Sequence, residues 1–312
     1  MIVPRGIFDG WWSLVLGCFS GICCVYCNME ISTSPHAPQG QPLTLEQALT
    51  NIRQTEDTGL RYYAAWWLGR MRVTADAAVT ALIEALQDEA DRSPDGGYPL
   101  RRNAAKALGK LGNPAAVPAL IACLGCGDYY VRESAAQALE ALGDNRAIAP
   151  LVELLAGGVE SAVQVPGKPH LVQPYNAILE ALGTLSAGND SLASLALPFL
   201  SHPVPNVQNA AARALYQMTG AAAYAERLVA VLQHEQLQLR RAALMDLGAV
   251  GYAPAADAIA ATLAENSMKL MSLKGVVEVQ LEREPPAGER AAQSSGLSAT
   301  TQHLLALMDG LL

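Results

Sequence analysis

Aromatic residues are scarce in this chain, and their scarcity argues against a sheet-rich fold. Phe, Trp and Tyr together make up 5% of the 312 residues, whereas all hydrophobic residues make up 51%. Alanine and leucine supply most of the difference, and both favour helices over strands. The composition therefore predicts a protein built from packed helices.

Basic runs and cysteines are also rare. The chain has 21 Lys and Arg against 29 Asp and Glu, which gives a formal net charge of −8. We expect no nucleic-acid partner, because such partners require clustered positive charge. Beyond residue 27 the cysteines are Cys123 and Cys126, which indicates a reducing, cytoplasmic location without a disulfide framework.

Familiar enzyme motifs are missing as well. The sequence has no phosphate-binding loop, no nucleophile elbow, no zinc-protease helix and no His pair with zinc-ligand spacing. Cys123 and Cys126 form a CxxC, but it follows an expected helix end without a redox-motif context, which favours a structural role. We expect no metal site and no cofactor.

Residues 1–28 differ from the rest of the chain. The 17 residues of Trp11–Cys27 carry no charge and contain four of the six cysteines, but a membrane span normally needs about 20 apolar residues. Three interpretations remain: a start-site artefact with translation beginning at Met29, an anchor or signal, and another role. We expect no membrane partner. Residues 29–43 form a flexible polar lead-in.

A repeated pattern organises residues 44–275. Each unit has an alanine-rich helix, a turn with glycine and a second apolar helix, and one leucine marks each first helix. The marker leucines are Leu68, Leu108, Leu139, Leu179, Leu215 and Leu247, at intervals of 40, 31, 40, 36 and 32 residues. Helix pairs of this length are typical of α-solenoids. We predict an all-α solenoid of about six HEAT-like helical-pair repeats.

Further helices are expected at both ends of the array. Thr44 and Gln47 have the spacing of a capping box, which predicts a first helix over residues 45–54. The pattern weakens toward its end, so residues 276–298 are interpreted as a linker. A last helix over residues 299–312 has leucines that would cap the array or contact a partner.

Two units contain insertions rich in proline and glycine, over residues 88–100 and 157–175. Insertions in a solenoid emerge at one edge and often carry function. Asp95, Arg101 and Arg102 border the first insertion, and His170 lies in the second. A solvated side chain is the simpler interpretation of each. His170 is also a candidate proton carrier near neutral pH.

The first unit stands out by its aromatic residues. Tyr62, Tyr63 and Trp66 occupy positions where the next two units have polar or charged residues. We expect the three rings to be exposed and to mark a binding surface; the alternative is that they pack beneath the helix over residues 45–54. Trp67 replaces an alanine and is expected to fill the terminal interface.

Arginine recurs seven residues before the marker leucine, at Arg61, Arg101, Arg132 and Arg240. An arginine that returns at each helix start is expected to bond neighbouring loop carbonyls or carboxylates. The alternative is that part of this ladder binds a ligand carboxylate. Tyr129 and Tyr130 precede one of these arginines, and they either extend an aromatic surface or pack in their loop.

Three stretches resemble a known family. They are residues 61–70 (RYYAAWWLGR), 91–112 (DRSPDGGYPLRRNAAKALGKLG) and 128–139 (DYYVRESAAQAL). They are similar to the HEAT-like bilin lyases, and in particular to the E-type subunits of heterodimeric phycocyanobilin lyases. Generic HEAT scaffolds share the repeats, whereas the string RSPDGGYPLRR is more specific. Residues 1–28 and 278–298 depart from the family.

The resemblance implies a function. With an F-type partner subunit, such a chain attaches phycocyanobilin through a thioether to a cysteine of the apo-phycocyanin α subunit, a step in phycobilisome assembly. The bilin is a substrate and not a cofactor. Two alternatives remain: a non-catalytic HEAT scaffold or chaperone for pigment proteins, and a sister lyase acting on the phycoerythrocyanin or phycoerythrin α subunit.

We hypothesise that such an enzyme acts mainly by positioning. Tyrosine and tryptophan rings would stack on the pigment, arginines would pair with its propionates, and a carboxylate would bond to its pyrrole nitrogens. The predicted binding residues are Tyr62, Tyr63, Trp66, Arg101, Arg102, Tyr129, Tyr130 and Glu133. The predicted catalytic residues are Asp95 and His170; His170 would take the acceptor thiol's proton, because the thiolate is the nucleophile.

Overall fold

The computed structural model describes residues 43–284 and 297–312, and these residues form one helical array. The described residues contain α-helices and short 3₁₀-helices and no β-strand, so the predicted all-α solenoid is confirmed. The predictions for residues 1–28 and for most of the lead-in lie outside the described residues, as does the larger part of the predicted linker.

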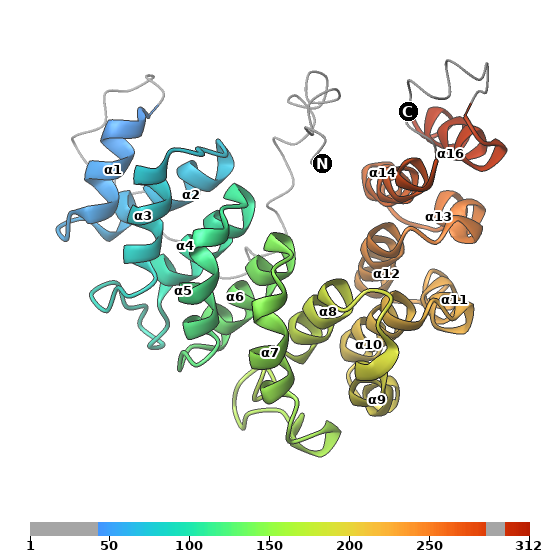
Figure 1. Cartoon of the computed structure of the whole chain (residues 1–312), viewed down its shortest axis with the longest axis horizontal. Helices are drawn as coiled ribbons and strands as arrows, with labels where there is room; N and C mark the ends of the chain where they lie inside the picture. The colour runs from blue at the N-terminus through green and yellow to red at the C-terminus, as the bar shows by residue number, and fades with distance from the viewer. Residues whose placement is uncertain (1–42, 285–296) are drawn as a thin grey trace. The chain divides into compact units, whose positions relative to one another are not determined.

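Six consecutive units each pair a first helix, here called the A helix, with a second one, the B helix (Figure 1). The A helices are α2 (Thr58–Arg70), α4 (Pro99–Leu111), α6 (Tyr129–Leu142), α8 (Tyr175–Leu185), α10 (Pro205–Thr219) and α12 (Leu237–Val250). The B helices are α3 (Asp76–Ala85), α5 (Val117–Cys123), α7 (Ile148–Leu154), α9 (Ala193–Ala196), α11 (Ala222–Val231) and α13 (Ala256–Ala261). Helix α1 (Leu45–Arg53) comes before these units, and α14 (Asn266–Arg283) and α16 (Ala299–Asp309) follow them.

Short 3₁₀-helices lead into several B helices. They are η2 (Pro114–Ala116), η3 (Asn145–Ala147), η5 (Asp190–Leu192) and η7 (Ala253–Ala255), while η4 (Val159–Ser161) lies in the second insertion and η6 (Leu197–Ser201) continues α9. Pro118 lies in the first turn of α5, where its missing N–H leaves no helix bond unmade.

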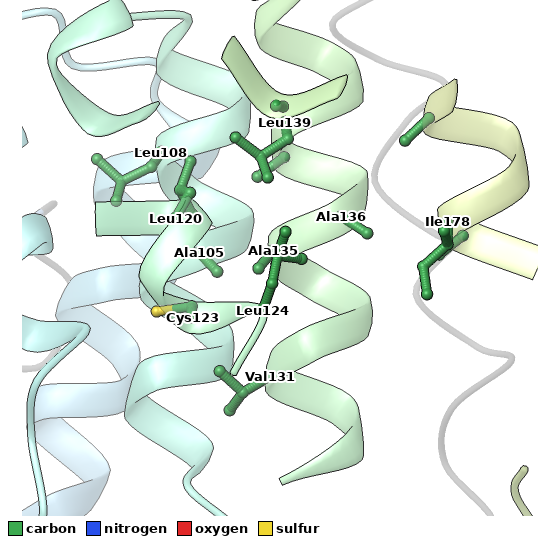
Figure 2. Packing of buried hydrophobic residues seen from close by; sticks show 14 of the residues in the cluster. Ala105, Leu108, Leu120, Cys123, Leu124, Val131, Ala135, Ala136, Leu139 and Ile178 are labelled. Atoms are coloured by element: carbon green, nitrogen blue, oxygen red, sulfur yellow. The ribbon is translucent and has the colours of Figure 1, made fainter. Parts of the chain in front are cut away.

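The core forms between successive units. Each A helix packs on the A helix of the next unit, and each B helix packs against the A helix that follows it. Leu108, Leu120 and Leu139, from α4, α5 and α6, belong to one buried cluster (Figure 2). A single helix pair could not bury its apolar side alone, so stability depends on the stacking of neighbours.

Small residues let the A helices approach closely at one register. A Cβ atom added to Gly69 would lie 2.7 Å from the Cα atom of Ala107 on the next A helix. A Cβ atom added to Gly183 would lie 2.5 Å from the Cα atom of Ala214. In both cases the residue that follows a buried leucine of one A helix meets the residue that precedes a buried leucine of the next A helix.

This register corrects one marker of the repeat. The leucine before Gly183 is Leu182, so Leu182 and not Leu179 is equivalent to Leu139 and Leu215. The intervals on either side become 43 and 33 residues. Leu179 and Leu182 are both buried, and leucine periodicity alone therefore did not distinguish them.

A Gly183→Ala variant is expected to lower the unfolding free energy by about 1–3 kcal/mol, the usual cost of overpacking. The new methyl group would meet helix backbone, which cannot turn aside as a side chain can. Gly127→Ala is the matched control, because a Cβ atom at Gly127 meets nothing within 4 Å. Urea denaturation measures the unfolding free energy of both variants. Equal values would show that the A helices can move apart to accept the methyl group without loss of stability.

The two ends of the array are capped by helices. The side chain of Thr44 accepts a hydrogen bond from the Gln47 N–H at 3.2 Å, and the Gln47 side chain accepts one from the Thr44 N–H at 2.9 Å, so the predicted capping box is confirmed. Helix α14 continues beyond residue 275, where the sequence suggested a linker, because Val276 is buried in the core beside α12. Leu304 of α16 is buried there too.

None of the helices within residues 43–284 and 297–312 has the length and apolar character needed to cross a membrane.

Candidate functional site

The two insertions meet in a pocket of about 460 Å³, here called the insertion pocket. This volume lies within the usual range for small-molecule sites. Its lining combines aromatic, cationic and acidic side chains from both insertions and from the start of α6. The charged and aromatic members are Arg92, Asp95, Tyr98, Asp128, Tyr129, Tyr130, Arg132, Lys168 and His170. Four predicted site residues, Asp95, Tyr129, Tyr130 and His170, therefore share one pocket.

The first insertion is held against the start of α6 by Asp128. One carboxylate oxygen of Asp128 accepts from the Tyr98 N–H and the other from the Tyr130 N–H, each at 2.8 Å. Ser93 closes the loop itself, since its hydroxyl accepts from the Gly97 N–H at 2.9 Å. A single carboxylate thus caps α6 and fixes one wall of the pocket.

The second insertion positions His170 over the tyrosines. The imidazole stacks on the Tyr129 ring, with 4.3 Å between the ring centres and 16° between the planes, and meets the Tyr130 ring edge-on. Its Nδ1 lies 2.9 Å from the Leu171 carbonyl oxygen. Because a carbonyl only accepts, this contact requires a proton on Nδ1. In the neutral form of the ring the lone pair then lies on Nε2, which is the arrangement that a general base requires.

Charges of both signs surround this imidazole. Burial raises the pKa of Glu133, while the positive charges of Arg102 and Lys106 oppose the rise. The Arg102 guanidinium lies 5.0 Å from the centre of the Tyr130 ring. Glu133 and Arg102, both predicted as binding residues, therefore adjoin the pocket.

Asp95 stands at the exposed rim and remains ionised. A hydrogen bond from the Ser93 hydroxyl lowers the pKa of Asp95, and the positive charge of Lys168 lowers it further. An ionised carboxylate accepts hydrogen bonds but has no proton to donate. Asp95 can therefore orient a ligand donor or accept a proton, and it does not suit the role of a general acid.

The arginine ladder holds loops together, which confirms the structural interpretation. Arg132 donates to the Cys126 carbonyl at 2.6 Å and to the Val172 carbonyl at 2.7 Å. Arg240 donates to the His234 carbonyl at 2.6 Å. These bonds join α6 and α12 to the loops before them, and at Arg132 also join α6 to the second insertion.

Arg101 belongs to the same ladder, and this counts against its predicted contact with a propionate. Its Nε donates to the Asp88 carbonyl, and its Nη2 lies 3.3 Å from the Gln87 carbonyl oxygen and 3.3 Å from a Glu89 carboxylate oxygen. The guanidinium also covers the Tyr98 ring, 4.1 Å from its centre. Arg101 thus fixes the first insertion, and other cations remain for a ligand carboxylate.

The aromatic residues of α2 are exposed as predicted, although they do not line the insertion pocket. Tyr62 and Tyr63 are each 46% exposed and Trp66 is 42% exposed, while Trp67 is partly buried against the core. The rings of Tyr63 and Trp66 stack with 5.5 Å between centres. Three large rings in contact with solvent form an aromatic surface at this end of the described array.

The reason for the exposure of Tyr63 differs from the one the sequence suggested. Its equivalents Asn103 and Ser134 were expected to be solvated, but both are buried. Asn103 faces the preceding A helix, and its side-chain amide donates to the Tyr62 carbonyl at 3.2 Å. Tyr63 is exposed because α2 is the first A helix of the described array, so its stacking side is not covered by another.

Residues two and six positions before each marker leucine lie on one side of the A helices, here called the A-helix face. From α2 to α12 these pairs are Tyr62 and Trp66, Arg102 and Lys106, Glu133 and Gln137, Asn176 and Glu180, Asn209 and Arg213, and Arg241 and Met245. The face therefore begins with aromatic rings, continues through the residues beside the insertion pocket, and reaches an ionic cluster in the middle of the array.

That ionic cluster is centred on Arg213, whose side chain meets carboxylates from three other A helices. Its guanidinium pairs with Glu140 of α6 and lies 3.6 Å from Glu180 of α8 and 3.6 Å from Asp246 of α12. Burial raises the pKa of Glu180 to about 8 and that of Asp246 to about 6. The cluster therefore joins four consecutive A helices.

Comparison with known proteins identifies the family. Residues 60–88 match the model of the PBS lyase HEAT-like repeat, and residues 92–164 match that of HEAT repeats. The chain is 60% identical over 269 residues to phycocyanobilin lyase subunit alpha of Picosynechococcus sp., a match covering 86% of this chain and 96% of that protein. The chain belongs to the phycocyanobilin lyase subunit alpha family.

Other relatives and a solved structure agree with this assignment. The subunit alpha of Nostoc sp. is 57% identical over 278 residues, covering 88% of this chain and 96% of that one. The bilin biosynthesis protein PecE of Mastigocladus laminosus is 47% identical over 257 residues, covering 82% and 88%. The solved complex of CpcE and CpcF of phycocyanin lyase from Nostoc sp. PCC7120 matches with a TM-score of 0.79 and 54% identity, covering 91% of this chain and 100% of that one.

Part of the site of this phycocyanobilin lyase subunit could not be predicted from its sequence. Lys168 and Tyr98 line the insertion pocket, but nothing in their local sequence set them apart from ordinary loop residues. Arg213 and Glu180 were missed because the ionic cluster forms from four separate helices. For Glu180 the available signal was its spacing from the marker leucine of its helix. Marking Leu179 in place of Leu182 concealed that signal.

The CxxC of this lyase subunit fits the structural role expected for it. Cys123 and Cys126, the cysteines of the described residues, are free thiols. Cys123 is buried in the leucine core between α4 and α6 (Figure 2). Burial raises the pKa of the Cys123 thiol to about 11, so very little thiolate forms at neutral pH.

Proposed function

We propose that this chain acts with an F-type partner subunit to attach phycocyanobilin to a cysteine of the phycocyanin α subunit. The identity of 60% to a phycocyanobilin lyase subunit alpha, over 96% of that protein, carries the proposal. The matched complex of CpcE and CpcF supports the partner. We expect the reaction to take place in the cytoplasm.

The reaction is the addition of a thiol across a carbon–carbon double bond of the pigment. A C–S bond and a C–H bond form, the S–H bond and the π bond break, and no group leaves. The thiolate is the reactive form, so a base must take the proton and return one to carbon. The site has to hold a long pigment and another protein's thiol together, and positioning of that kind can supply much of the rate increase.

The insertion pocket has residues suited to these tasks. His170 offers the Nε2 lone pair for the thiol proton, because its Nδ1 is engaged by the Leu171 carbonyl. Tyr129 and Tyr130 offer rings for stacking beside it. Lys168 and Arg92 bring positive charge to the pocket and would attract the propionates. The rings of Tyr62 and Trp66 would extend contact with the pigment along the A-helix face.

Reconstitution tests this function. The chain, an F-type partner, phycocyanobilin and apo-phycocyanin α subunit are mixed, and pigment that stays bound after denaturation in acidic urea is measured. We expect a covalent adduct that is absent when this chain is omitted. A scaffold or chaperone would give no covalent adduct, and a sister lyase would prefer the phycoerythrocyanin or phycoerythrin α subunit over the phycocyanin one.

Propionate recognition at Lys168 makes a separate prediction. Phycocyanobilin dimethyl ester is expected to bind the wild-type complex about 10-fold more weakly than the free acid, because each charge-assisted bond contributes on the order of 1.5–3 kcal/mol. In Lys168→Gln the two pigments should differ less. Lys274→Gln is the control, since Lys274 lies on α14 and pairs with Glu278. Equal discrimination by wild type and Lys168→Gln would assign the propionates elsewhere.

A further inference from the structure

The chain between α7 and α8 projects beyond the helices (Figure 1) and contains a short two-stranded ribbon within the second insertion. The base of this ribbon is fixed on both strands. On one strand the buried His202 donates from Nε2 to the Ala162 carbonyl at 2.8 Å. On the other strand Arg132 donates to the Val172 carbonyl at 2.7 Å. The ribbon is therefore attached firmly to the helical array.

One face of the ribbon carries valines together with His170. Gln164 and Leu171 lie opposite each other in an antiparallel bridge, and because side chains alternate along a strand, the residues next to these two point to the other face. Those neighbours are Val163, Val165, His170 and Val172. All of them except Val163 line the insertion pocket. Leu171, on the opposite face, packs against the core, so the face with the valines is the one that adjoins the pocket.

Val163 and Val172, here called the valine pair, leave much of their apolar surface in water. Val163 is 55% exposed and Val172 is 41% exposed. They lie opposite each other on the two strands, and the Val172 N–H donates to the Val163 carbonyl at 2.9 Å. Because the strands are already held by backbone bonds and by the contacts at their base, packing within the ribbon does not account for valine at both positions. Adjacent apolar side chains that stay exposed often mark a contact surface for another molecule.

The acceptor protein is the molecule that has to reach this face of the ribbon. In the proposed reaction its thiol gives a proton to His170, which lies two residues before Val172 on the same face. Side chains at this spacing along a strand are about 7 Å apart. An acceptor cysteine that meets His170 therefore brings residues of its own chain against the valine pair. Apolar residues gain from that contact because they leave water, whereas a charged residue would lose its hydration without gaining a partner.

We propose that the valine pair is a docking surface for the acceptor protein and selects apolar residues beside its reactive cysteine. This inference rests on the proposed function and deepens it, because it assigns recognition of the acceptor to residues that take no part in proton transfer. Val163 lies outside the lining of the insertion pocket, so it contacts the acceptor protein and not the pigment. The valine pair then governs the KM for the acceptor, while His170 governs the rate of the bond-forming step.

The experiment measures thioether formation by the complex of this chain with its F-type partner, at saturating phycocyanobilin and increasing apo-phycocyanin α subunit. Val163→Ser is expected to raise the KM for the acceptor about fivefold and to change kcat less than twofold, because uniform binding is lost while the base remains. Val172→Ser should raise this KM as well. Val163→Ile keeps the apolar surface and should stay within twofold of wild type. Leu263→Ser is the matched control, since Leu263 is 80% exposed in the turn between α13 and α14.

Two further measurements show which molecule the valine pair contacts. Pigment binding without acceptor, followed by visible absorption, and assembly with the F-type subunit, followed by gel filtration, should both be unchanged in Val163→Ser. A loss of either would assign the valine pair to the pigment or to the partner subunit and overturn the inference. So would a KM within twofold of wild type in both serine variants, while the proposed function would stand. If the wild-type complex forms no thioether, the proposed function fails and this inference fails with it.

Discussion

Arg213→Met is expected to lower the unfolding free energy by about 3–5 kcal/mol at pH 8, the usual cost of removing one partner from a buried ion pair. Methionine keeps most of the volume but leaves Glu140 and Asp246 without the guanidinium that they face. Urea denaturation followed by circular dichroism measures the loss. The effect is large because one side chain serves four helices.

The pH dependence of this loss follows from the raised pKa values. Burial raises the pKa of Glu180 to about 8 and that of Asp246 to about 6, above their ordinary values of 4.5 and 3.8. The folded state therefore holds these protons more tightly than the unfolded chain, and stability falls as the pH rises from about 4 to about 8. Without Arg213 both pKa values rise further, so Arg213→Met should lose less stability at pH 5 than at pH 8.

Two controls show whether the loss comes from charge. Arg227→Met removes an exposed arginine that donates to the Leu200 carbonyl at 3.0 Å, and it should cost less than about 1 kcal/mol. Arg213→Met combined with Glu180→Gln should lose less than the sum of the two single changes, because the groups are coupled. A loss no greater than that of Arg227→Met would show that the cluster is solvated and contributes little.

His170→Gln is expected to slow thioether formation about 100-fold at pH 7, the lower part of the range for general-base catalysis. Glutamine can still donate to the Leu171 carbonyl but cannot accept a proton from the thiol. Noncovalent pigment binding should change much less than the rate. To measure the rate, the complex, the pigment and the apo-phycocyanin α subunit are mixed, and the reaction is stopped by denaturation after set times. The amount of covalent adduct is then measured.

The pH profile separates a base from a positioning residue. If His170 deprotonates the thiol, the variant should recover much of its rate as the pH approaches about 8.5, where a free thiol ionises by itself. His303→Gln is the control, because His303 lies on α16 and pairs with Asp257 at 3.0 Å. A His170→Gln rate within twofold of wild type across this pH range would remove His170 from the catalytic step.

The repeats and the caps could be read from the chain because they depend on local chemistry. The Thr44 capping box and the second helix of each pair follow from residues a few positions apart, and the structure confirms both. The marker at Leu179 was wrong for a physical reason. Consecutive turns of α8 bury both Leu179 and Leu182, and only the close contact of Gly183 with Ala214 identifies the equivalent residue.

The candidate site was predictable in parts. The two insertions and His170 were identified from composition, and the structure brings them together at Tyr129. The role of Arg101 could not be predicted. An arginine at a helix start can donate to a loop carbonyl or to a ligand carboxylate, and only the structure of the surrounding loop shows which it does.

The sequence by itself determined that this chain is a stack of helix pairs, that aromatic residues mark its first unit, and that two insertions interrupt the repeat. It did so because helix periodicity, capping and turn chemistry act over a few residues. Only the tertiary structure decided that Glu140, Glu180 and Asp246 meet at Arg213. These residues are tens of positions apart, and their meeting depends on how closely successive A helices pack.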